Sequence, residues 1–171
     1  MRLPNICGVL LVMLTAAGCD APTDPALTPE GLSAVKFGMS PTEAAKALGV
    51  PFTARQARED EACWYSRPQE ETGPGVTYMV VNGKIARIDV RAPSNVKSAQ
   101  GIGVGASSED IKKTYGDKVS VTPHKYAENG SYLEIVAPGA NAGLLFEAVD
   151  GKIISFRAGA LEPLRYVESC A

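Results

Sequence analysis

The sequence predicts an α+β fold, built as a tandem repeat of units that each combine a helix with an antiparallel β-sheet. Two segments, residues 37–49 and 104–116, share one order: a turn glycine, a capped helix and a terminal glycine. A hairpin signal, Asn-Gly or Asp-Gly, follows 34 and 35 residues after the terminal glycine. Seventeen glycines and twelve prolines indicate many turns and short elements. We therefore expect a first repeat over residues 31–92 and a second over residues 93–171.

Residues 1–18 have the composition of a secretory leader. They carry one charge, Arg2, and an apolar run over residues 6–14, which is too short to span a bilayer. Ala17 and Gly18 before Cys19 resemble the lipobox of bacterial lipoproteins, although Ala16 stands where that family usually has Leu. The resemblance implies a diacylglycerol thioether on Cys19, with palmitate as a typical acyl chain. The alternative is an ordinary secretory leader that is cut nearby.

Residues 19–30 predict an extended tether, because they contain three prolines and no apolar period. With the lipid on Cys19, this indicates a cell-envelope protein whose globular part lies in the periplasm. Asp20 does not decide between the inner and the outer membrane. The formal net charge of −2 comes without a basic run, which argues against nucleic acid as a partner.

The four cysteines reduce to one pair. Cys7 is removed with the leader and Cys19 is lipidated, so Cys63 and Cys170 remain. In an oxidising compartment a lone pair is most simply a disulfide. The alternative, a nucleophilic cysteine, requires a histidine partner, and His124 is the only histidine.

The first predicted helix follows Ser40, whose hydroxyl suits the N-cap. Pro41 suits the first helical position, Glu43 completes a capping box, and Gly49 suits a left-handed end. The second helix has the same pattern, with Ser107 as the cap, Asp110 in the capping box and Gly116 at the end.

Strands are predicted over residues 62–66, 76–81, 84–90, 131–136, 143–149 and 152–157. Asn82-Gly83 and Asp150-Gly151 are expected to form type I′ turns. In residues 84–90, strict alternation places Ile85, Arg87 and Asp89 on one face and the remaining residues on the other. Because both faces mix apolar and charged residues, the sequence does not assign the buried face.

The segment from Phe37-Gly38-Met39-Ser40 to Leu48-Gly49 resembles a signature of the β-lactamase inhibitor protein family. It is also similar to the small SmpA/OmlA-type lipoprotein of the outer-membrane β-barrel assembly machine. The resemblance implies helices packed on an antiparallel sheet, with two such units in tandem. The second copy departs from it, with Val104-Gly105-Ala106 in place of the Gly-Met pair, and a Cys63–Cys170 bridge would join the halves instead of lying within each. No binding residue is carried over.

Signals for catalysis are weak, so no enzyme, cofactor or metal is expected. The glycines of residues 101–105 lack the spacing of a phosphate loop, and the single His124 makes a poor zinc site. The acidic clusters at residues 59–61 and 70–71 fit a solvated surface better than a catalytic carboxylate pair.

Several residues are of the types that anchor protein interfaces. They are Trp64, Tyr65, Arg67, Tyr78, His124, Lys125 and Tyr126. The alternative is that Trp64 and Tyr78 are core residues and the others lie scattered on the surface. We expect a non-catalytic binding or scaffold module whose partner is another envelope protein. The alternatives are an inhibitor of a periplasmic or secreted hydrolase, suggested by the family resemblance, and an enzyme acting on cell wall or glycan.

Overall fold

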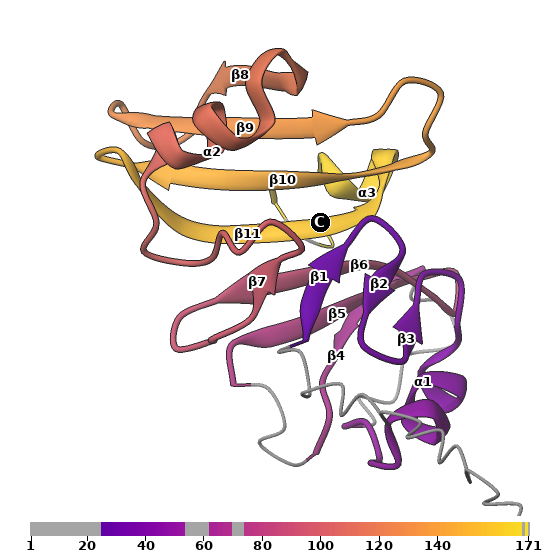
Figure 1. Cartoon of the computed structure of the whole chain (residues 1–171). Helices are drawn as coiled ribbons and strands as arrows, with labels where there is room; N and C mark the ends of the chain where they lie inside the picture. Colours follow the sequence, from indigo (N-terminus) through magenta and orange to yellow (C-terminus); the bar gives the residue numbers. More distant parts are fainter. Residues whose placement is uncertain (1–24, 54–61, 70–73, 169, 171) are drawn as a thin grey trace, which may run out of the picture.

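The computed structural model describes residues 25–53, 62–69, 74–168 and 170. The leader 1–18, Cys19 and the acidic clusters at 59–61 and 70–71 lie outside these residues. Among the described residues the chain forms eleven strands but only three short α-helices, and the strands make two sheets (Figure 1). The predicted fold class, a tandem of helix-plus-sheet units, is therefore wrong: the protein is mainly β.

The larger sheet has seven antiparallel strands in the order β4-β5-β6-β11-β10-β9-β8. Their bounds are β4 Cys63–Ser66, β5 Val76–Val81, β6 Lys84–Arg91, β8 Val119–Pro123, β9 Gly130–Val136, β10 Ala142–Val149 and β11 Lys152–Ala160. The two halves of the chain meet where β6 pairs with β11, Arg87 lying opposite Gly159. Because this pairing satisfies an edge that each half would otherwise expose, the halves form one continuous sheet instead of two units.

The smaller sheet has four strands in the order β3-β2-β1-β7. They are β1 Ala26–Thr28, β2 Gly31–Leu32, β3 Val35–Lys36 and β7 Lys97–Ser98. β1 pairs in parallel with β7, and Leu27 is fully buried. Ala26–Thr28, which were expected to lie in an extended tether, are therefore part of the folded domain. Strands of two or three residues show no alternation, so the sequence pattern did not reveal them.

The two capped helices are confirmed, as α1 Pro41–Leu48 and α2 Ser108–Tyr115. Each has the capping box, with the Ser40 hydroxyl accepting from the Glu43 amide and the Asp110 carboxylate accepting from the Ser107 amide. Gly49 is left-handed as expected, with φ 73° and ψ 13°. The chain instead continues from Gly116 into a 3₁₀ turn, η1 Gly116–Lys118. A third helix, α3 Leu161–Leu164, has no counterpart among the described residues of the first half.

The two helices are tied to the large sheet by matching contacts. The Gly38 amide donates to the Ile85 carbonyl, 2.9 Å, and the Gly105 amide donates to the Ile153 carbonyl, 2.8 Å. The amides of Ile85 and Ile153 donate back to residues just before each helix. The same hydrogen-bonding pattern thus joins each helix to the large sheet, although the structure around the two helices differs.

Both hairpins are confirmed, and each contains a β-bulge that changes which side chains are buried. Asn82 and Asp150 both have φ of 49°, as a type I′ turn requires. Met79 pairs with Arg87 while Val80 pairs with Ile85, so Ala86 is an extra residue. The expected common face of Ile85, Arg87 and Asp89 is therefore wrong: Ile85 joins the apolar core, and the other two residues point to the opposite side.

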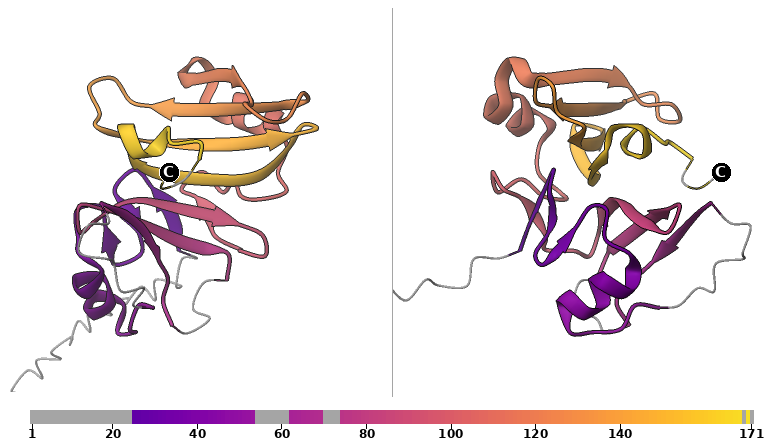
Figure 2. Two further views of the ribbon diagram at one scale, coloured as in Figure 1. Left: turned by 180° about the vertical axis from the view of Figure 1, so that it is seen from behind. Right: turned by 90° about the vertical axis from the view of Figure 1, so that its right-hand side faces the viewer.

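The apolar core lies between one face of the large sheet and a layer made by the small sheet, α1 and α2 (Figure 2). Phe146 and Phe156 stack there with ring centroids 5.2 Å apart, and Ile111 of α2 is fully buried. The right-hand view of Figure 2 shows α3 and the C-terminus on the other side of the large sheet. The central strands β6 and β11 are thus covered on both faces, which explains why most of their residues are buried.

Candidate functional site

The second face of the large sheet carries a row of buried charges. Arg87 and Asp89 lie on β6, Arg157 on β11 and Glu147 on β10. Arg87, Asp89 and Arg157 are 2%, 5% and 3% exposed. Asp89 lies directly opposite Arg157 in the β6–β11 register, so the charges come from three neighbouring strands. Burial of this kind is unfavourable unless each charge is paired and hydrogen-bonded.

The cover over this row is the C-terminal segment, residues 161–168 and 170. Arg87 Nη1 donates to the carbonyls of Pro163, 2.6 Å, and Tyr166, 3.0 Å. Arg157 Nε donates to the Leu164 carbonyl, 2.7 Å. The segment is therefore held by its backbone carbonyls, which accept from guanidinium groups anchored in the sheet.

Two side chains complete the hydrogen bonds of Arg87. Its Nε donates to the Asp89 carboxylate at 3.0 Å, and its Nη2 donates to the Tyr65 hydroxyl at 2.5 Å. Burial raises the pKa of Asp89, and the neighbouring guanidiniums of Arg87, Arg157 and Arg91 oppose that rise. Arg87 thus connects β4, β6 and the C-terminal segment through one side chain.

Glu147 is the second carboxylate of the row. It accepts from the guanidinium of Arg157 and from the Ser155 hydroxyl, the latter at 2.7 Å. Burial by itself raises its pKa, but the Arg157 charge and these hydrogen bonds outweigh burial, so the pKa lies below its usual value. Arg157 Nη2 is buried without a hydrogen-bond partner among the described side chains. The other buried side-chain nitrogen and oxygen atoms of this row each have a hydrogen-bond partner, as is typical of a structural cluster.

The far end of the C-terminal segment bridges two distant parts of the sheet. Cys170 is bonded to Cys63 on β4, which confirms the predicted disulfide. Two residues earlier, Glu168 accepts from Lys125 and from the Tyr126 hydroxyl, both in the β8–β9 loop. Opposite ends of the strand order are thus fastened to the same short stretch of chain.

A groove of about 570 Å³ runs beside this end of the segment. Residues from both halves line it: Ala62, Cys63, Val81, Asn82, Lys125, Tyr166, Val167, Glu168 and Cys170. Two exposed hydrophobic side chains belong to this region, Tyr126 at 63% exposure and Val167 at 37%. We call this region, with Tyr126, the C-terminal groove. Its exposed tyrosine is of a residue type that is enriched in protein-binding surfaces.

The structure brings only some of the predicted interface residues to this groove. Lys125 and Tyr126 lie beside it. Tyr65 contacts the C-terminal segment only indirectly, because its hydroxyl accepts from Arg87. His124 is half-buried and stacks on Tyr132 at 4.6 Å. Its Nδ1 accepts from the backbone amides of Tyr126 and Ala127, so the imidazole shapes the loop that presents Tyr126.

The other predicted residues lie elsewhere. Tyr78 is 3% exposed and packs edge-to-face on Phe52, and burial raises its pKa to about 12. Trp64 is half-buried against the same apolar core. The side chain of Arg67 is exposed and lines a separate groove at the opposite end of β4. Tyr78 and Trp64 thus serve as packing residues.

Sequence reasoning missed Arg157, Glu147 and the C-terminal residues Tyr166 to Glu168 as parts of one site. A signal was present, because polar residues recur at alternate positions after both primed turns, at Arg87 and Asp89 and again at Ser155 and Arg157. What the sequence did not show is that these residues face a buried surface.

Among the described residues no group of three His, Cys, Asp or Glu side chains is placed to hold a metal ion. In the same part of the chain no helix is long and apolar enough to cross a bilayer. No protein-family model, curated protein or solved structure matches this chain. The likeness to the β-lactamase inhibitor family therefore rests on the short motif around Ser40 alone.

Proposed function

We propose that the protein is a lipid-anchored cell-envelope protein whose folded part binds another envelope protein through the C-terminal groove. The proposal is carried by one observation: residues from both halves of the chain and the disulfide-tied C-terminal segment converge on a groove bordered by exposed Tyr126 and Val167. Anchoring follows from the lipobox-like residues before Cys19. The disulfide supports an oxidising compartment such as the periplasm.

The groove is prepared for a partner in advance. Tyr126 is fixed at its hydroxyl by Glu168 and at its backbone by His124, and Glu168 lies two residues before the disulfide. A binding surface held in one conformation loses less entropy when the partner arrives. Tyrosine is also among the residues that contribute most to protein interfaces.

The test uses a photo-crosslinking amino acid at position 126 or 167 of the full chain in living cells. We expect both positions to crosslink to one and the same envelope protein, which also co-purifies stoichiometrically with the unmodified chain. Tyr126→Ala should weaken that association by about tenfold or more. A matched control is Lys113, exposed on α2 on the other side of the large sheet: a crosslinker there should not capture this protein. Equal capture from position 113, or none from 126 and 167, would overturn the proposal.

A second candidate, inhibition of a periplasmic or secreted hydrolase, is favoured by the projection of Tyr126 from the β8–β9 loop at 63% exposure. An inhibitor places such a side chain in the active-site cleft of its target. If the crosslinked partner is a hydrolase, the purified chain should inhibit its activity, and Tyr126→Ala should relieve that inhibition. A hydrolase that binds but keeps its full activity contradicts this second candidate.

A further inference from the structure

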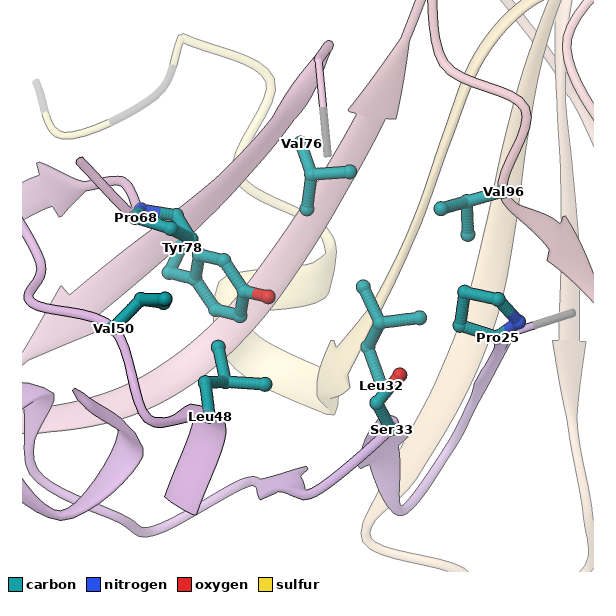
Figure 3. A pocket seen from close by; sticks show the side chains of 9 residues that line it. All are labelled: Pro25, Leu32, Ser33, Leu48, Val50, Pro68, Val76, Tyr78 and Val96. Atoms are coloured by element: carbon teal, nitrogen blue, oxygen red, sulfur yellow. The ribbon is translucent and has the colours of Figure 1, made fainter. Parts of the chain in front are cut away.

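The two ends of the seven-stranded sheet differ in how their apolar side chains are covered. Near α1, Tyr78 of β5 faces Leu32 and Leu48 across a small pocket, which Figure 3 shows. The pocket has a volume of about 100 Å³, less than the cavity of about 150 Å³ that accommodates benzene, so this end is closely packed. At the end of the sheet farthest from α1 in Figure 1, Val121 of β8 is 50% exposed.

β8 is an edge strand whose backbone hydrogen-bonding groups are open on one side. Among the described residues its one strand neighbour is β9. The His124 amide donates to the Gly130 carbonyl at 3.0 Å, and the bonds of an antiparallel pair pass through alternate residues. The N–H and C=O groups of Val119 and Val121 therefore point away from β9. Pro123, at the next alternate position, has no N–H to donate, as is usual for a proline on an edge strand.

The residues of β8 lack the charges that commonly keep edge strands from pairing. All residues of Val119–Pro123 are uncharged, and those after Val119 are exposed. Val121 lies directly opposite Leu133, and Leu133 lies opposite Phe146 in the apolar core. The apolar surface of the core therefore continues to the open edge, where another strand can cover it.

A second copy of the same strand fits this edge. Antiparallel pairing about a twofold axis at Val121 places this residue opposite its own copy, where a charged side chain would repel itself. Val121 then exchanges N–H···O bonds with the second copy's Val121, and the Val119 amide donates to the second copy's Pro123 carbonyl. Each open amide of the strand thus has an acceptor, although Pro123 offers no donor.

The charges of α2 also complement a second copy. α2 packs against β8 and β9, and its Ile111 is fully buried. Glu109 and Asp110 lie in the first turn of α2, and Lys112 and Lys113 lie in the last. A twofold axis perpendicular to the sheet reverses every direction in its plane, so the acidic start of α2 is directed toward the basic end of the second α2. Such charge complementarity favours the twofold arrangement.

We propose that two copies of the chain pair through β8, so that the seven-stranded sheet of one copy continues into that of the other. One short strand and one helix from each copy bury less than the roughly 1,600 Å² of a standard interface, so the association is reversible. None of the residues Val119–Pro123 lines the C-terminal groove. The pairing therefore uses a surface separate from the one proposed for the envelope partner.

The first test places a photo-crosslinking amino acid at position 121 of the full chain in living cells that also produce a second copy with a different tag. We expect position 121 to capture the second copy. The matched control is position 154, because Ile154 is 46% exposed but lies on β11, an inner strand of the sheet. A crosslinker at position 154 should not capture the second copy.

Co-purification of the two tagged copies measures the pairing itself. Val121→Lys places like charges at the twofold axis and should lower recovery of the second copy by about tenfold. Val121→Thr keeps a β-branched, uncharged side chain and should change recovery by less than about twofold. Ile154→Lys, with the same added charge on an inner strand, should also change recovery by less than about twofold. Thermal unfolding checks that each variant is folded, and crosslinking from position 121 serves if Val121→Lys is not.

Three outcomes would contradict the pairing. Equal capture of the second copy from positions 121 and 154 would mean that the copies meet by random encounter. Capture of an unrelated protein from position 121, without the second copy, would mean that the edge accepts a strand from another chain. Equal losses of recovery for Val121→Lys and Ile154→Lys would mean that the added charge acts through the net charge of the chain and not through the β8 edge.

Discussion

The two faces of the seven-stranded sheet are buried by different means. One face is covered by apolar side chains from α1, α2 and the small sheet, with Phe146 and Phe156 at its centre. The other face buries Arg87, Asp89, Arg157 and Glu147 beneath the C-terminal segment. Apolar contact needs no exact partner, whereas a buried charge does. The charged face therefore depends on a specific segment being held in place, and the disulfide to Cys63 holds it.

Removal of the Cys63–Cys170 disulfide is expected to have the largest effect on stability. Cys63→Ser/Cys170→Ser opens a loop with a sequence separation of 107, and the chain-entropy model gives a loss of about 4–5 kcal/mol in the free energy of unfolding. Urea denaturation measures this loss. Hydrogen exchange should rise at the amides of residues 164–168 more than in β10 or β11. The parent chain under reductant is the matched control, and a loss below about 1 kcal/mol would show that the charged face closes without the bridge.

The next effect compares the two faces directly. Arg87→Met leaves Asp89 buried without its partner, so we expect a loss of about 3–5 kcal/mol. Arg87→Met/Asp89→Leu removes both charges and should recover at least half of that loss, because it leaves no unpaired carboxylate. On the apolar face, Phe146→Ala should cost a similar amount, about 3–5 kcal/mol.

Urea denaturation of the three variants decides between the mechanisms. If the Arg87/Asp89 double variant regains free energy of unfolding relative to Arg87→Met, the loss in the single variant came from the unpaired Asp89 carboxylate. If the double variant is as unstable as Arg87→Met alone, the contacts of Arg87 with the carbonyls of Pro163 and Tyr166 matter more than its ion pair.

The smallest effect concerns pH and Glu147. Its pKa in the folded chain lies below the usual 4.5, so the ionised carboxylate stabilises the fold above that pH. This contribution is lost as the pH falls through the lowered pKa. Glu147→Gln should therefore lower the free energy of unfolding at pH 7. It should also make that free energy fall less steeply between pH 7 and pH 3. Chemical denaturation from pH 7 to pH 3 measures both. An unchanged acid limb in the variant would show that Glu147 is not the group that titrates there.

Short local patterns predicted their structures well. The Ser40 and Ser107 caps and the turns at Asn82 and Asp150 appear as expected, because each depends on side chains within a few residues of one another. The bulge at Ala86 was not predicted, and it reversed the face assigned to Ile85. A bulge depends on the neighbouring strand, so alternation within one strand does not reveal it.

The candidate site was predicted in parts only. The residue types at Tyr65, Lys125 and Tyr126 were identified, as was the Cys63–Cys170 pair. Their convergence was not, because it depends on Glu168 and Cys170, at the far end of the C-terminal segment, which reach the β8–β9 loop and β4. Contacts across 76 residues, such as Arg87 to Pro163, leave no periodic trace in a sequence.

By itself the sequence determined the local elements, two capped helices and two primed hairpins, each set by chemistry between near neighbours. The number of cysteines, and not their spacing, indicated the Cys63–Cys170 bridge. Only the tertiary structure decided that β6 pairs with β11, which turns two expected units into one sheet. It also decided that both faces of the central strands are covered, so that Arg87 and Arg157 are buried. The physical reason is that strand pairing and burial are set by distant segments, whereas caps and turns are satisfied within one or two turns of chain.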